Sequence, residues 1–127
     1  MGPVRHARLL VVDDEAPIRF AMQDFFSARG YEVDCAAEKE AAEALLGSRR
    51  YALMFADLCL AGAAGQQGLD LVAWARERRP ELRIVVLTAF GSAEAETEAR
   101  RLGADAFLQK PMSLPELDQV VAGLVGG

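Results

Sequence analysis

Residues 51–57 read Tyr-Ala-Leu-Met-Phe-Ala-Asp, an apolar run that ends in a carboxylate. Three further apolar runs, residues 9–12, 82–87 and 106–109, also lead directly into polar side chains. In an open parallel sheet, the C-terminal ends of the strands form the edge at which ligands bind. The sequence therefore predicts a functional site at this edge. The side chains delivered there are Asp13, Asp14, Asp57, Thr88 and Lys110.

The order of the segments predicts an α/β fold. The apolar runs are rich in Val, Ile and Leu without strict alternation, as is typical of strands buried on both faces. A shorter strand is expected over residues 31–36, and a capping box at Ser113 and Glu116 starts the last helix. Five strands alternating with five helices predict a parallel, doubly wound sheet in a three-layer sandwich. The other expected helices cover residues 16–29, 39–49, 69–79 and 92–102.

The helix over residues 92–102 has an apolar face made largely of alanine, so we expect it to be the most weakly anchored. Residues 58–68 are expected to form a long loop over the site, because residues 61–68 are too small and glycine-rich to pack. The sequence thus predicts two loosely held segments next to the acidic edge.

Size and composition favour one soluble domain. The chain has 127 residues, of which 52% are hydrophobic, so we expect a single domain over residues 1–127 with a core from about 8 to 124. A net charge of −5 disfavours direct binding to nucleic acid or to an anionic membrane surface. The sequence shows no signal peptide and no long apolar stretch, which indicates a cytoplasmic protein.

The cysteines and the histidine point to no soft-metal or redox site. Cys35 and Cys59 lie in different segments and form neither a CxxC pair nor a metal-ligand cluster. Cys35 is expected to be a small buried residue, and His6 to be exposed near the N-terminus. Zinc is therefore disfavoured.

Three carboxylates at one sheet edge repel one another unless a cation lies between them. Mg²⁺ suits such a site, because it binds through one or two carboxylates and accepts phosphate oxygens as further ligands. Asp57 is the best candidate nucleophile toward a phosphoryl group, with Asp13 and Asp14 holding Mg²⁺. Lys110 and Thr88 would contact phosphoryl oxygens. Each of these residues alone has a simpler explanation; an Asp-Asp pair after a strand, for example, often caps a helix. The arrival of all five residues at one sheet edge, in this order, favours a functional site.

Several motifs together resemble the receiver domain of two-component response regulators, including the single-domain chemotaxis-regulator type. The resemblance covers residues 8–124. It rests on the segments Leu10-Val11-Val12-Asp13-Asp14-Glu15, Phe55-Ala56-Asp57-Leu58, Val86-Leu87-Thr88-Ala89, Arg101-Leu102-Gly103-Ala104-Asp105-Ala106-Phe107 and Leu108-Gln109-Lys110-Pro111.

The resemblance implies a flavodoxin-like strand order of 2-1-3-4-5 and a role for each site residue. Asp57 would be the phosphoacceptor, and Mg²⁺ would be held by Asp13, Asp14, Asp57 and the Cys59 backbone carbonyl. The Lys110–Pro111 peptide would be cis. Thr88 and Phe107 would form a switch pair that repacks the surface of the fourth helix, the fifth strand and the last helix.

The resemblance also implies partners. A histidine kinase or phosphotransfer protein would supply the phosphoryl group, and the output would be a separate protein or an attached domain that this chain does not include. The chain would be no enzyme beyond its own Mg²⁺-dependent phosphorylation and dephosphorylation. Two departures stand out: Ala61 replaces a usual proline, and the loop after Asp57 is about three residues longer. Cys59 and Phe90 occupy positions that affect water access, so a bulky Phe90 is expected to slow hydrolysis of the acyl phosphate.

Other functions remain open on the sequence alone. The main alternative is a receiver-fold interaction module that works without phosphorylation, through the face of its last helix. A flavin-binding protein of the same topology would need a glycine- and hydroxyl-rich phosphate loop after the first strand, where this chain has Asp13-Asp14-Glu15. An aspartate-based phosphatase would need more catalytic apparatus than a chain of this length displays.

Overall fold

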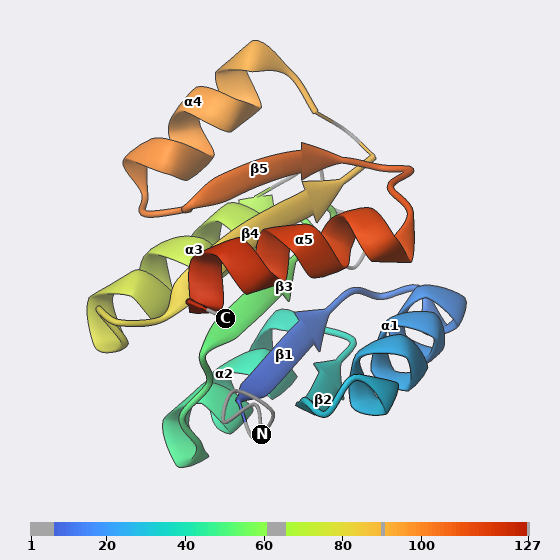
Figure 1. Cartoon of the computed structure of the whole chain (residues 1–127). Helices are drawn as coiled ribbons and strands as arrows, with labels where there is room; N and C mark the ends of the chain where they lie inside the picture. The colour runs from blue at the N-terminus through green and yellow to red at the C-terminus, as the bar shows by residue number, and fades with distance from the viewer. Residues whose placement is uncertain (1–6, 61–65, 90, 127) are drawn as a thin grey trace.

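Five short apolar segments pair in parallel to form one sheet with the order β2-β1-β3-β4-β5, as expected (Figure 1). The computed structural model describes residues 7–60, 66–89 and 91–126. Every pairing is parallel, so all strand C-termini point to the same edge of the sheet. The strands are β1 (Arg8–Val12), β2 (Glu32–Ala36), β3 (Leu53–Ala56), β4 (Arg83–Thr88) and β5 (Ala106–Gln109).

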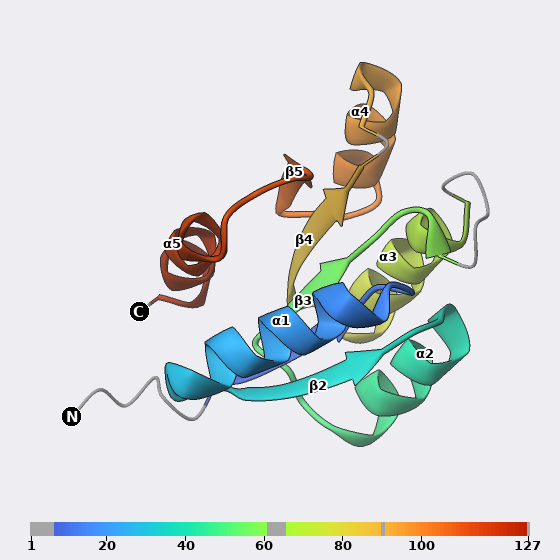
Figure 2. The same cartoon turned by 90° about the vertical axis from the view of Figure 1, so that its right-hand side faces the viewer.

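Helices cover both faces of the sheet and give the expected three layers. Residues of α1 and α5 pack on one face, and residues of α2, α3 and α4 pack on the other. Figure 2 shows α2 and α3 on the opposite side of the sheet from α5. The helices are α1 (Ala16–Ala28), α2 (Lys39–Ser48), α3 (Gln66–Arg78), α4 (Ala93–Arg101) and α5 (Leu114–Val125).

The core consists of two apolar layers, one on each side of the sheet. All four residues of β3 are buried, and they alternate between the layers: Met54 and Ala56 face α2 and α3, whereas Leu53 and Phe55 face α1 and α5. This double burial explains why the strand sequences lack a polar-apolar alternation.

The expected weak anchoring of α4 agrees with its burial. Ala99 is the only buried residue of α4, whereas each of the other helices buries at least two. Ser92 caps the helix through its hydroxyl, which accepts a hydrogen bond from the Ala95 amide at 3.0 Å. The predicted capping box of α5 is also present, with Ser113 and Glu116 as the reciprocal pair.

The predicted loop over residues 58–68 was wrong at its C-terminal end, whereas residues 58–60 lie outside the α-helices and strands as expected. Leu58 and Leu60 are buried, and α3 begins at Gln66, three residues earlier than predicted. The Gly68 amide donates to the Leu58 carbonyl at 3.2 Å. Glycine allows this close approach because it has no Cβ atom. The remaining loop residues, 61–65, lie outside the described part of the chain, and so does the position of Ala61.

Cys35 is half-buried rather than buried, because β2 is an edge strand; its Sγ lies 3.8 Å from the Arg19 carbonyl oxygen. His6 and Phe90 lie outside the described residues. Within those residues, no helix has the length and apolar character needed to cross a membrane.

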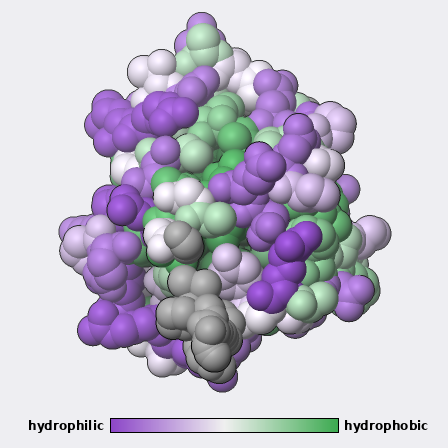
Figure 3. All heavy atoms as spheres, in the orientation of Figure 1, coloured by the Kyte–Doolittle hydropathy of each residue, from purple (hydrophilic) through white to green (hydrophobic). Residues whose placement is uncertain are grey.

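Apolar side chains reach the surface around β5. Figure 3 shows apolar atoms gathered between α4 and α5, where β5 forms the other edge of the sheet. Phe107 and Leu108 of β5 are half-buried, as are Val120 and Leu124 of α5. This surface between α4 and α5 is therefore partly apolar (Figure 3).

Candidate functional site

The ammonium group of Lys110 joins the ends of three strands. Its Nζ atom lies 2.7 Å from Oδ2 of Asp13, which follows β1, and 3.1 Å from Oδ2 of Asp57, which follows β3. Lys110 itself directly follows β5, and its peptide bond to Pro111 is cis. The lysine also lies 3.5 Å from the Glu15 carboxylate. The structure thus brings together residues that are up to 97 positions apart in the sequence.

The backbone holds both buried carboxylates in place. The Asp13 amide donates to the Ala36 carbonyl and the Asp57 amide donates to the Val12 carbonyl, each at 3.1 Å, so the sheet pairing continues to the site. Each carboxylate then accepts a hydrogen bond from the amide two residues later: Glu15 to Asp13 at 2.9 Å and Cys59 to Asp57 at 3.1 Å. In both side chains one oxygen fixes the local turn while the other contacts Lys110.

Burial and charge act in opposite directions on the pKa values of Asp13 and Lys110. Asp13 is 3% exposed and Asp57 is 5% exposed. Burial raises the pKa of Asp13 above its usual value, although hydrogen bonds from Lys110 and the Glu15 amide counteract the rise. Burial alone would lower the pKa of Lys110, but the hydrogen bonds and charges of Asp13 and Asp57 outweigh it and raise that pKa. Lys110 therefore stays cationic at neutral pH.

The same edge offers oxygen ligands for a metal ion. Asp13, Asp14, Glu15 and Asp57 each provide one carboxylate oxygen, and these four oxygens lie within 4.8 Å of one another. Asp14 and Glu15 are exposed, so water and ions reach the cluster from outside. The set contains neither sulfur nor nitrogen ligands and carries more negative charge than the ammonium of Lys110 balances. Such a set fits a hard divalent cation such as Mg²⁺.

Glu15 was not among the predicted site residues. Its sequence signal was its position directly after the Asp13-Asp14 pair, which places it in the same β1–α1 turn. Cys59, by contrast, was predicted for its backbone carbonyl, and the contact described here is that of its amide with Asp57.

Thr88 and Phe107 lie on one face of the sheet. Thr88 is fully buried at the end of β4, and its carbonyl accepts a hydrogen bond from the Lys110 amide at 2.9 Å. Side chains alternate along a strand, so Thr88 shares the face of Val86, toward α3 and α4. Phe107 pairs with Val86 across the strands and packs half-buried on that face. The two side chains therefore lie on the same face of adjacent strands, offset by two residues in register.

Gly68 supports the backbone behind Asp57. A Cβ atom built on Gly68 would lie 2.3 Å from Leu58 Cα and 2.6 Å from the Asp57 carbonyl oxygen. Only glycine fits at this distance. The first turn of α3 thereby fixes the segment that carries Asp57, a contact that sequence reasoning placed in a loop.

Comparison with known proteins assigns the family. The family model for the response regulator receiver domain matches residues 9–122, nearly the whole chain. The chain belongs to this family. The transcriptional regulatory protein PmrA of Pectobacterium parmentieri is 32% identical over 118 residues, which are 93% of this chain and 52% of that protein. The response regulator protein FleR of Pseudomonas aeruginosa is 33% identical over 91% of this chain and 24% of its own length.

Solved structures agree with this assignment. The CheY-like receiver domain protein of Methanospirillum hungatei JF-1 superposes with a TM-score of 0.90 at 26% identity, over 95% of this chain and 94% of that one. A response regulator of Burkholderia pseudomallei, solved with a phosphorylated aspartic acid, a calcium ion and citrate, has a TM-score of 0.83 at 30% identity, over 93% and 66% of the two chains. This receiver domain thus spans about half or less of the two curated relatives named above.

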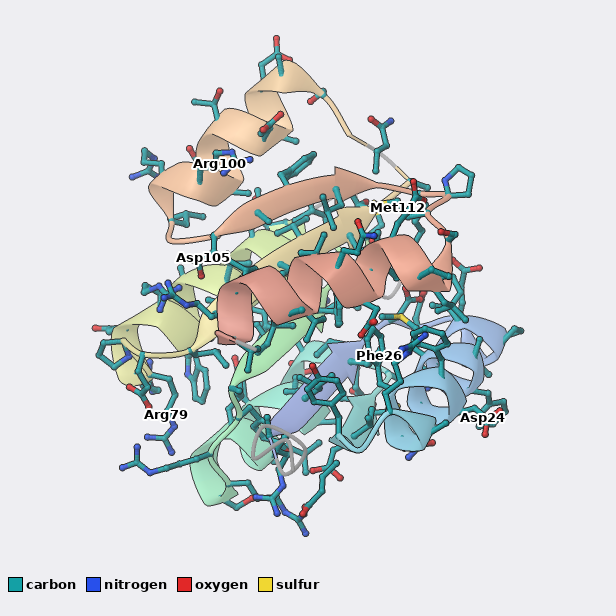
Figure 4. All side chains as sticks on the ribbon, viewed as in Figure 1. Asp24, Phe26, Arg79, Arg100, Asp105 and Met112 are labelled. Carbon is teal, nitrogen blue, oxygen red and sulfur yellow. The ribbon has the colours of Figure 1, made fainter. Side chains whose placement is uncertain are left out.

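Polar contacts hold the chain just after the C-terminal end of α4 in this receiver domain. The guanidinium of Arg76 in α3 donates to the Gly103 carbonyl at 2.8 Å and to the Asp105 carboxylate at 3.0 Å. Asp105 also accepts from the Ile84 amide of β4 at 2.8 Å. Figure 4 shows Arg100 and Asp105 at this corner, at the opposite end of β5 from Met112. The C-terminal end of α4 is therefore held by polar contacts, while its body makes few apolar ones.

Proposed function

We propose that this receiver domain accepts a phosphoryl group on Asp57 from a histidine kinase or a phosphotransfer protein. The observation that carries the proposal is the position of Lys110 Nζ, within hydrogen-bond distance of both Asp13 and Asp57. Phosphoryl transfer needs a positioned nucleophile, a cation beside it and ligands for a metal ion. The buried Asp57 carboxylate, the Lys110 ammonium and the neighbouring acidic side chains match these needs. We further propose that residues 1–127 act as one domain and work in the cytoplasm.

In the proposed reaction an Asp57 carboxylate oxygen attacks the phosphorus atom. A phosphorus–oxygen bond forms as the phosphorus–nitrogen bond of the donor histidine breaks, and the histidine nitrogen keeps the electron pair. Lys110, already placed beside Asp57, neutralises a phosphoryl oxygen, and the Thr88 hydroxyl binds another. Asp57 thereby becomes an acyl phosphate.

Asp13, Asp14, Asp57 and the Cys59 carbonyl would hold Mg²⁺, and Glu15 joins the set as an outer acidic neighbour. The bound ion supplies charge neutralisation of the phosphoryl oxygens. In the Burkholderia pseudomallei relative a calcium ion accompanies a phosphorylated aspartic acid, which supports a divalent cation here. The domain would catalyse only two reactions, its own phosphorylation by small phosphodonors and its own dephosphorylation.

Phosphorylation would change the surface formed by α4, β5 and α5, which a partner would then recognise. Phosphorylation adds charge at one point, and a response elsewhere needs an element with two arrangements. Thr88 and Phe107 share the face toward α4, and α4 buries only Ala99, so that helix can shift at low cost. The receiving partner would be a downstream protein or an attached output domain, consistent with the greater length of PmrA and FleR.

A spectroscopic experiment tests the proposal. Uniformly ¹⁵N-labelled protein is titrated with BeF₃⁻ in the presence of Mg²⁺, and amide shifts are followed at Asp57, Thr88 and Phe107. We expect shifts in the wild type and in Asp24→Asn, whose carboxylate is exposed on α1, but none in Asp57→Asn. Figure 4 shows Asp24 pointing away from the sheet. An unchanged wild-type spectrum would favour the phosphorylation-independent interaction module instead.

A further inference from the structure

Arg19 reaches back from α1 to the acidic loop. Its Nη1 atom donates a hydrogen bond to the backbone carbonyl of Asp13 at 2.8 Å. Its own amide donates to the Glu15 carbonyl at 3.1 Å, which starts the helix. The Glu15 side chain provides no cap for α1, and Arg19 does not replace one, because its guanidinium donates to a carbonyl and cannot accept from a helix amide. The Arg19 side chain instead joins the first turn of α1 to the end of β1.

The bonded carbonyl lies just beyond the sheet. The pairing of β1 with both neighbours ends at Val12, opposite Ala36 and Ala56. The Asp13 amide still bonds to the Ala36 carbonyl, whereas the Asp13 carbonyl finds its partner in Arg19. A planar peptide moves as a unit, so holding this oxygen fixes the orientation of the whole bond between Asp13 and Asp14.

Asp14 directly follows the peptide that Arg19 holds. Its side chain is exposed, in contrast to the carboxylates of Asp13 and Asp57, which are buried and bonded to Lys110. The direction in which the Asp14 carboxylate leaves the chain therefore follows from the orientation of the preceding peptide. Groups that orient metal ligands affect metal affinity even though they do not touch the ion.

We infer that Arg19 is a positioning residue, which holds the Asp13–Asp14 peptide in the orientation that presents Asp14 to a divalent cation. The inference rests on the proposed function, since it assigns a role toward the proposed Mg²⁺ site. Charge alone predicts the opposite effect: a cation beside the acidic cluster repels Mg²⁺, so removing it would strengthen binding. The two effects have opposite signs, and one measurement separates them.

The test is the Mg²⁺ dissociation constant of the intact chain, measured from the amide shifts of residues 13, 14 and 57. Arg19→Met keeps much of the apolar stem but loses the hydrogen bond, and we expect it to bind Mg²⁺ about 10-fold more weakly. Arg19→Lys keeps a donor and the charge, and it should bind more tightly than Arg19→Met. Thermal unfolding of each variant verifies that the fold is retained.

Gln23 provides a matched control on the same helix. Its Nε2 atom donates to the Val33 carbonyl at 3.2 Å, again from a side chain of α1 to a backbone oxygen. Gln23→Ala should lower thermal stability without changing the Mg²⁺ dissociation constant. Equal or tighter binding by folded Arg19→Met would overturn the inference while leaving the proposed function intact. A wild type that binds no Mg²⁺ would overturn both.

Discussion

Replacing Gly68 by alanine tests the contact behind Asp57. The new Cβ atom would lie 2.3 Å from Leu58 Cα, 2.6 Å from the Asp57 carbonyl oxygen and 2.7 Å from the Leu58 carbonyl oxygen. All three are backbone atoms of the segment that carries the site, so no side chain can rotate away. Either α3 or the backbone after Asp57 must move.

The size of the effect follows from two opposing terms. Forcing an extra carbon into a packed region costs about 1–3 kcal/mol, and contacts with backbone place Gly68→Ala toward the upper end. Alanine regains up to about 1 kcal/mol of helix propensity over glycine. The expected net loss is about 1–2 kcal/mol of unfolding free energy, equivalent to a fall of about 3–10 °C in Tm for a domain of this size.

Gly47→Ala is the matched control for this substitution. Gly47 lies on an exposed position of α2, and a Cβ atom there would meet nothing within 4 Å. This variant should gain up to about 1 kcal/mol. Urea unfolding of both variants measures the difference, expected to be about 1–3 kcal/mol. Equal stability of the two variants would refute the close approach of α3 to the Asp57 segment.

Three further substitutions test other parts of the account. Asp13→Asn should raise the unfolding free energy at pH 7, because burial raises the pKa of Asp13 in the folded state and ionisation of this carboxyl therefore opposes folding. The gain should shrink as the pH falls through that raised pKa and vanish below the usual pKa of 3.8, where the carboxyl is protonated in both states; urea unfolding across pH measures it. Gly103→Ala should destabilise by about 1–3 kcal/mol, because φ is +120° and the Cβ atom would lie 2.6 Å from Arg76 Cγ; a Tm equal to that of the wild type would contradict this. Lys110→Met should slow labelling of Asp57 by acetyl phosphate at least about 10-fold, measured by intact mass over time, and an unchanged rate would remove Lys110 from the reaction.

The sequence pattern was sufficient to predict a parallel α/β sheet and the edge at which the candidate site lies, whereas the strand order followed from the family resemblance. Four apolar runs ending in Asp13, Asp57, Thr88 and Lys110 defined that edge, because parallel strands all present their C-terminal ends on one side. The helix caps at Ser92 and Ser113 were also predictable, since capping depends on local sequence.

Contacts between distant segments were not predictable in the same way. The start of α3 at Gln66 depends on Gly68 meeting the backbone of Leu58, and a glycine-rich sequence is equally typical of a loop. The bond from Arg19 to the Asp13 carbonyl likewise has no sequence pattern, because an arginine on a helix usually points to solvent. Such contacts depend on tertiary geometry.

Phosphorylation of Asp57 is tested by identifying the residue that becomes modified. The purified chain is incubated with acetyl phosphate, with Mg²⁺ or with excess EDTA, and intact mass and peptide mapping follow. We predict a single phosphoryl group on Asp57 that requires Mg²⁺, is removed by hydroxylamine as expected of an acyl phosphate, and is lost in Asp57→Asn. Labelling that persists in Asp57→Asn, or a wild type that stays unlabelled with Mg²⁺, would contradict the assignment of Asp57 as the phosphoacceptor.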